Sequence, residues 1–109
     1  MFYARLVQFK LGNGQRATAE GITNEFDKIS RTLAGFRGNV YFYDDAVSEY
    51  RALNYWDTKE DAVRANQLLF PKLLGKLNDL TDEPPTYKFF EVYDPNEGGS
   101  VLASHIKWV

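Results

Sequence analysis

The sequence predicts a single α+β domain with the ferredoxin-like order strand, helix, strand, strand, helix, strand and an antiparallel sheet. Three observations lead to this fold class. Four short runs are rich in aromatic and β-branched residues, which is typical of strands. Two longer segments between them place apolar residues at helical spacing. The length of 109 residues matches one domain and is enough to bury a core.

The first strand is expected at residues 2–10 (FYARLVQFK), and the glycine-rich turn signal of residues 12–14 ends it. A helix follows from about Thr18. Gly35 stands two residues beyond the last apolar position of this helix, where a left-handed cap favours glycine. The apolar residues are three or four positions apart and therefore lie on one helix face: Ile22, Phe26, Ile29 and Leu33.

A hairpin and a last strand complete the predicted sheet. Residues 39–44 (NVYFYD) and 49–56 (EYRALNYW) pair across a short polar turn, and residues 86–93 (TYKFFEVY) form the fourth strand. The predicted domain covers residues 1–93. Residues 94–109 form a C-terminal tail with a flexible start and an apolar end, which we expect to pack on a second copy of the chain, along its sheet edge.

The second helix is expected to begin after Asp57 or Thr58, either of which can cap it, with an acidic residue three positions later completing a capping box. Its apolar pattern runs to about residue 77 and contains Pro71. Because proline lacks the backbone N–H and clashes with the preceding turn, the sequence predicts a kink or a break near Phe70.

Composition excludes several classes of protein. The chain has no Cys, which excludes a disulfide framework, a Cys-ligated zinc and a thiol nucleophile. Its net charge is -2, with acidic and basic residues interspersed, so we expect no nucleic-acid partner. No apolar run is long enough to cross a membrane, and the first five residues are no signal peptide, so the expected location is the cytoplasm.

Aromatic residues predict a second copy of the chain as partner. The sequence holds 17 aromatics, and 13 of them fall in the four predicted strands, on both faces of the sheet. Two right-handed crossovers put both helices on the same face, which leaves the other face apolar and uncovered. A homodimer packed through this sheet face is the simplest solution. The alternative is that tyrosines tolerate water and the tail covers the rest.

Two motifs resemble the antibiotic biosynthesis monooxygenase-like group of the dimeric α+β barrel superfamily. Residues 33–38 (LAGFRG) are similar to the family's glycine-containing turn into the second strand. Residues 53–62 (LNYWDTKEDA) resemble its strand-end Trp followed by a capped helix. The resemblance covers about residues 1–93 and implies a ferredoxin-like domain that forms a dimeric α+β barrel, with a pocket between the sheet and the helices of each subunit.

The resemblance also implies that an Asn and the strand-end Trp line this pocket, which makes Asn54 and Trp56 the catalytic candidates. Asn54 can donate a hydrogen bond to a substrate oxygen, and Trp56 can form a wall. The alternatives are a partly exposed Asn54 at the sheet end and a Trp56 that belongs to the core. The other residues expected around a substrate are Tyr50, Phe26, Ile22 and Leu69.

Other polar residues are weaker candidates. His105 is the only histidine, and we expect it at the surface or an interface rather than in catalysis. Arg5 and Arg51 lie in predicted strands, and Glu49 and Glu91 are their expected carboxylate partners. A substrate-anion clamp is the alternative role for these arginines.

The resulting hypothesis is a cofactor-independent monooxygenase-like enzyme acting on a small aromatic or quinol-type substrate. We expect no metal, because one His and no Cys offer no ligand cluster, and no nucleotide cofactor, because there is no fingerprint for one. Haem-degrading relatives have a His on the second helix, which residues 58–77 lack. The alternative is a non-catalytic homodimeric protein that binds a small apolar ligand or stabilises a partner, for instance in a stress response. A related decarboxylase, dehydratase or isomerase is not separated by sequence.

Overall fold

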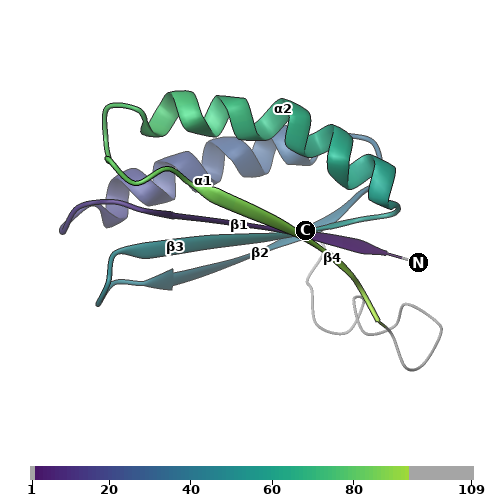
Figure 1. The fold of residues 1–109 in the computed structure, drawn as a ribbon, viewed down its shortest axis with the longest axis horizontal. Coiled ribbons are helices and arrows are strands. Elements are labelled where there is room, and N and C mark those ends of the chain that lie inside the picture. The colour runs from purple at the N-terminus through teal and green to yellow at the C-terminus, as the bar shows by residue number, and fades with distance from the viewer. Residues whose placement is uncertain (1, 94–109) are drawn as a thin grey trace.

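The computed structural model describes residues 2–93, and its element order is the predicted one (Figure 1). The sheet order is β2-β3-β1-β4, with every neighbouring pair antiparallel. The tail at residues 94–109, including His105, lies outside the described residues. The elements are β1 (Tyr3–Lys10), α1 (Arg16–Ser30), β2 (Phe36–Asp44), β3 (Glu49–Trp56), α2 (Lys59–Leu77) and β4 (Thr86–Glu91).

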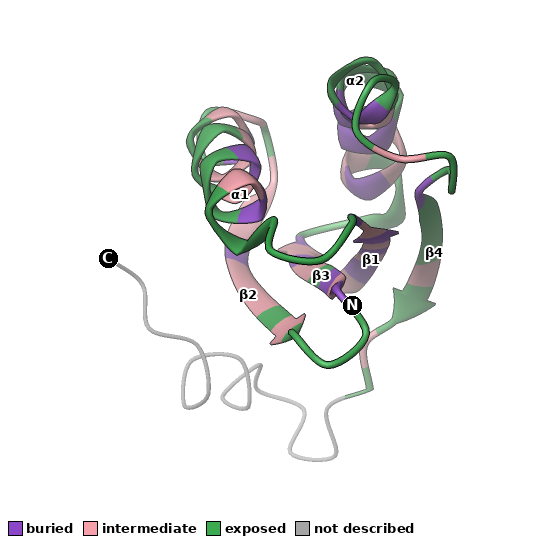
Figure 2. Cartoon of the chain, turned by 90° about the vertical axis from the view of Figure 1, so that its left-hand side faces the viewer, coloured by how far each residue is buried: buried purple, intermediate pink, exposed green. Residues whose placement is uncertain are grey.

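Both helices cover one face of the sheet, as Figure 2 shows in end view. The antiparallel register decides which side chains they cover. In β1 and β3, Arg5 is opposite Asn54, Val7 is opposite Ala52, and Phe9 is opposite Tyr50. Because side chains alternate along a strand, these residues share the helix-covered face. The fold therefore confirms the ferredoxin-like prediction.

The first helix begins two residues earlier than predicted, at Arg16, and ends at Ser30 with Arg31 as its C-cap. The expected helix cap at Gly35 is wrong, because this glycine lies beyond the helix end, in the turn into β2. Gly35 has a φ of +81°, in the left-handed region that glycine adopts without strain. A Cβ at this position would collide with the side chain of Asp61 on α2. Gly35 therefore allows both the turn into β2 and the close approach of α2.

The second helix confirms one prediction and corrects another. Thr58 is the N-cap, and its hydroxyl accepts a hydrogen bond from the Asp61 backbone N–H at 3.1 Å. Of the two expected outcomes at Pro71, the break is wrong, because α2 continues through Pro71 to Leu77, and the kink stays a prediction. Because proline lacks an N–H, the carbonyl of Gln67 loses its helical hydrogen bond. Gln67 is exposed, so water can bond this carbonyl instead. Burial of leucines on both sides of the proline keeps the helix in one piece.

The core between helices and sheet consists of two apolar clusters. One cluster joins β1, β3 and both helices: Val7, Phe9, Leu11, Ala19, Ile22, Tyr50, Leu73 and Leu77. The other lies under the first half of α2: Trp56, Ala62, Ala65 and Leu69. Within residues 2–93, no helix is long and apolar enough to cross a membrane.

Candidate functional site

A small cavity lies between the two helices and the sheet, where the pocket was predicted. Its walls are apolar for the most part and come from α1 (Ile22, Phe26), α2 (Leu69) and the strands. Its buried polar residues are Ser30, Asn54 and Arg5. Its volume is about 40 Å³. This space holds a few water molecules, whereas an apolar cavity that binds benzene measures about 150 Å³. An aromatic substrate therefore requires the helices or their side chains to move outward.

The structure brings four of the six predicted site residues to this cavity and leaves two in the core. Asn54, Phe26, Ile22 and Leu69 line it. Trp56 is completely buried in the cluster under α2 and packs edge-to-face on Phe36, with ring centroids 5.6 Å apart. Tyr50 is 2% exposed and packs against other aromatic rings: Phe9 at 5.5 Å and Tyr43 at 5.1 Å between centroids.

Asn54 is a buried amide with hydrogen bonds at both Oδ1 and Nδ2, rather than a partly exposed residue at the sheet end. Its side chain is in β3 on the helix-covered face, and the residue is 3% exposed. Its Oδ1 accepts a hydrogen bond from Nη1 of Arg5 at 2.7 Å. Its Nδ2 donates to Oδ1 of Asn39, in the neighbouring strand, at 2.6 Å. These two bonds fix the amide orientation beside the cavity.

Arg5 is the charged group of this site. The residue is 4% exposed, and its Nε donates to Oδ1 of Asn66 on α2 at 2.8 Å. Burial lowers the pKa of the guanidinium to about 10, so the group remains protonated at neutral pH. The expected carboxylate partner is wrong for Arg5, whereas Arg51 does pair with Glu49, within β3 rather than across strands. Glu49 is on the opposite face of the sheet and pairs there with Arg51, its neighbour along β3, at 2.6 Å, and Glu91 is opposite Tyr3.

The hydrogen-bond chain continues from Asn39 to α1. Oδ1 of Asp27 accepts hydrogen bonds from Asn39 Nδ2 and the Tyr41 hydroxyl, each at 2.7 Å, and Oδ2 accepts from Nε of Arg31 at 2.8 Å. Burial raises the pKa of Asp27, but the bonds from Arg31, Asn39 and Tyr41 outweigh it and hold this pKa below its usual value. Burial and the Asp27 carboxylate raise the pKa of Tyr41 far above its usual range. Tyr41 is therefore a fixed O–H donor.

Sequence reasoning missed most of this network, although two signals were present. Arg5 is two positions from both Tyr3 and Val7, so it shares their face of the strand, which periodicity assigns to the core. Asn66 is four positions after Ala62 and three before Leu69, which is the spacing of the buried stripe of α2. A polar residue in each apolar pattern indicated a buried polar contact. Only the fold shows that the two residues contact each other.

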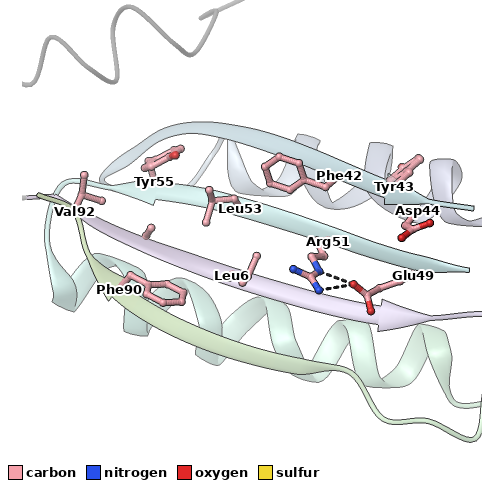
Figure 3. Close-up of a pocket in the computed structure, with 11 residues that line it drawn as sticks. Leu6, Phe42, Tyr43, Asp44, Glu49, Arg51, Leu53, Tyr55, Phe90 and Val92 are labelled. Carbon is pink, nitrogen blue, oxygen red and sulfur yellow. Dashed lines mark hydrogen bonds and ion pairs between the residues drawn. The ribbon is translucent and has the colours of Figure 1, made fainter. Parts of the chain in front are cut away.

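A larger hollow lies on the opposite, uncovered face of the sheet. It measures about 720 Å³ and is open to solvent (Figure 3). At one end Arg51 and Glu49 form their ion pair. Two of its aromatic residues are strongly exposed, Phe42 at 49% and Phe90 at 39%. The side chains that project onto its floor and rim are mainly apolar: Leu6, Phe42, Leu53, Tyr55, Phe90 and Val92.

The described residues offer no site for a metal ion. No three His, Cys, Asp or Glu side chains of residues 2–93 come close enough together to hold one. The polar groups beside the cavity are a guanidinium, amides and hydroxyls, which donate hydrogen bonds to anionic or carbonyl oxygens. Such an arrangement can orient an organic molecule and stabilise negative charge on it.

The fold is that of the antibiotic biosynthesis monooxygenase-like proteins. No protein-family model and no curated protein matches the sequence, whereas solved structures match the fold well. SnoaB, a cofactor-independent oxygenase from Streptomyces nogalater, has a TM-score of 0.67 and 16% identity over 88% of this chain and 97% of its own. A Streptomyces coelicolor monooxygenase in complex with nanaomycin D has the same TM-score and identity, over 84% and 88%.

A third structure, from Nitrosomonas europaea, carries the provisional name antibiotic biosynthesis monooxygenase. It has a TM-score of 0.71 and 12% identity over 86% of this chain and 92% of its own. The likeness covers nearly the whole length of these proteins and confirms the predicted resemblance at the level of the fold. At such low identity, the site has to be interpreted from the residues of this chain.

Proposed function

We propose that the protein is a cofactor-independent monooxygenase-like enzyme that takes a small aromatic or quinol-type substrate into the cavity between sheet and helices. The observation that carries this proposal is the hydrogen-bonded pair of Arg5 and Asn54 in the wall of an otherwise largely apolar cavity. Preorganised donors in a water-poor site stabilise developing negative charge strongly. The names of the solved structures with this fold support the same class of reaction.

The proposed chemistry uses the substrate as the reductant of dioxygen. An electron-rich phenol or quinol loses two hydrogens and gains one oxygen atom, and the second oxygen atom leaves as water. Asn54 orients a substrate oxygen through a hydrogen bond, and the positive charge of Arg5 stabilises the anionic form of the substrate. Phe26 and Leu69 pack against its ring. In this proposal Trp56 is a residue of the core under α2 and takes no direct part in catalysis.

Substrate admission requires the two helices to separate near the cavity. Across this region Lys76 of α2 and Glu25 of α1 form an ion pair at 3.1 Å, with both side chains about half exposed. Exposed ion pairs of this kind contribute at most about 1 kcal/mol. Separation of the helices therefore meets little electrostatic resistance.

Oxygen consumption with a panel of hydroquinones and dihydroxynaphthalenes tests the proposal. Asn54→Ala is expected to lower kcat/KM roughly a hundredfold, the usual loss when one such donor is removed. Asn24→Ala, which removes an exposed amide on α1, is the matched control and should leave the rate unchanged. Thermal unfolding of each variant verifies that it is folded. Equal rates in the wild type and Asn54→Ala would refute the assigned role of Asn54.

A second copy of the chain is the partner that we propose for the uncovered sheet face. Exposed apolar patches of this kind mark association surfaces in soluble proteins. Replacing Phe42 and Phe90 together by Lys should convert a dimer into a folded monomer, since both rings are already partly exposed. Sedimentation velocity measures the change. A wild-type protein that is monomeric at micromolar concentration would contradict the proposal.

The alternative function is non-catalytic, either binding of a small apolar ligand or stabilisation of a partner. It is supported by the cavity volume of only about 40 Å³, because the space under the helices is then nearly filled. A protein of this kind binds its ligand tightly without consuming oxygen. Mass spectrometry of ligands that survive purification, followed by oxygen measurements with the ligand found, separates the two functions. A bound phenol or quinol that is turned over supports the enzyme, and a bound compound that stays unchanged supports the binding protein.

A further inference from the structure

Arg5 differs from every other arginine in the described chain. The remaining five are Arg16, Arg31, Arg37, Arg51 and Arg64, and each forms an ion pair with a carboxylate. Within residues 2–93 only Arg5 lacks such a partner, although it is also the most deeply buried of the six. A buried charge without a counter-charge is costly to a folded protein. This arginine therefore carries an unusual, uncompensated charge.

The bonds of Arg5 leave part of its donor capacity unused. A guanidinium has five N–H groups, and its bonds to Asn66 and Asn54 go through Nε and Nη1 to neutral amide oxygens. No hydrogen bond within residues 2–93 engages Nη2. The same side chain lines the cavity under the helices. The two amides hold the planar group in place, so that its remaining donors are available to a molecule in the cavity.

We propose that Arg5 is the anion-recognition residue of this cavity, and that the ligand is a small, mainly apolar ring compound with one anionic oxygen group. A phenolate, an enolate or a carboxylate supplies the missing counter-charge. The inference rests on the proposed use of this cavity as the substrate site, and it restricts the substrate to acids. The apolar walls around Phe26 and Leu69 match the body of such a molecule and exclude multiply charged anions such as phosphate esters.

Benzoate and benzamide test the charge requirement, because they have nearly the same shape and differ by one negative charge. Calorimetry measures both affinities for the intact protein. We expect benzoate to bind roughly tenfold to a hundredfold more tightly than benzamide, as is typical of a hydrogen bond to a charged group. 4-Nitrophenolate, followed by its absorbance, is the second probe and distinguishes a preference for phenolates from one for carboxylates.

Two variants remove the free charge in different ways. Asn66→Asp keeps the shape of the side chain and places a carboxylate beside Nε of Arg5, so the protein supplies its own counter-charge. Arg5→Met removes the charge and fills the space with an apolar chain, which buried ion sites often tolerate. Arg64→Met is the matched control, since Arg64 is exposed on α2 and pairs with Asp61. Asn66→Asp decides the question if Arg5→Met does not fold.

The inference is supported if both site variants lose the preference for benzoate while Arg64→Met keeps it. It is overturned if the wild type binds neither anionic probe, binds benzoate and benzamide equally, or keeps its preference in Asn66→Asp. Oxygen consumption separates this outcome from the proposed function. Anion binding without turnover refutes the oxygenase and keeps the role of Arg5, whereas turnover that Asn66→Asp leaves unchanged refutes the role of Arg5 and keeps the oxygenase.

Discussion

Shortening Leu69 to Ala is the most informative change at the cavity. Leu69 is 1% exposed, belongs to the cluster under α2 and also lines the cavity. The substitution removes three buried carbons, worth about 0.8 kcal/mol each, or about 2.4 kcal/mol in total. If about 60 Å³ of new space stays empty, a cavity cost of about 24 cal/mol per Å³ adds about 1.4 kcal/mol. We therefore expect the free energy of unfolding to fall by about 4 kcal/mol.

The enlarged space should also bind a small aromatic molecule. The removed carbons extend the existing 40 Å³ toward the size at which apolar cavities accept benzene. Benzene at about a hundred times its dissociation constant would then restore about 2.7 kcal/mol of stability. Urea unfolding with and without benzene measures both effects. The wild type, whose cavity is too small when closed, should gain much less.

Leu74→Ala is the matched control for this experiment, because Leu74 is on the same helix but 42% exposed. Its substitution should change stability by about 0.5 kcal/mol or less. A loss below about 1.5 kcal/mol in Leu69→Ala would show that α2 does not pack on the sheet as described. A loss of only about 2.4 kcal/mol, without any stabilisation by benzene, would show that the core collapses into the new space, and would count against a site that expands around a ring.

Further predictions concern the hydrogen-bond chain, the core and the turn. Tyr41→Phe should cost roughly 1.5–3 kcal/mol in urea unfolding, because it removes a hydrogen bond to a charged group. The pKa of Asp27 is lower in the folded protein than its unfolded value of 3.8, so the Asp27 carboxylate stabilises the fold above pH 3.8 and loses this effect as the pH falls further. Asp27→Asn should therefore make the free energy of unfolding fall less steeply at acid pH. Trp56→Phe should lower the free energy of unfolding by about 1–2 kcal/mol, because the ring is completely buried. It should change turnover less than twofold, because the ring does not line the cavity. A larger loss of turnover in a stable variant would contradict this. Gly35→Ala should lower the melting temperature through at least about 1 kcal/mol of backbone strain, given a φ of +81°.

The order of elements and several local details are predictable because they depend on neighbouring residues. Thr58 is visible as a cap because a hydroxyl before an acidic first turn is a local signal. Gly35 is visible as a turn glycine because a positive φ excludes most side chains, although the C-cap of α1 is Arg31. The break considered at Pro71 does not occur, because burial of the leucines around it along α2 outweighs the loss of one hydrogen bond.

The sequence by itself determined the ferredoxin-like order, the face of each strand and the surplus of apolar residues on both faces. These features follow from periods of two and 3.6 residues, which are properties of the chain alone. Only the tertiary structure decided that Arg5 meets Asn54 and Asn66, 49 and 61 positions away, and that it has no carboxylate partner within residues 2–93. Strand register and the position of α2 over the sheet create these contacts. Both arise from packing between distant segments, which no local pattern encodes.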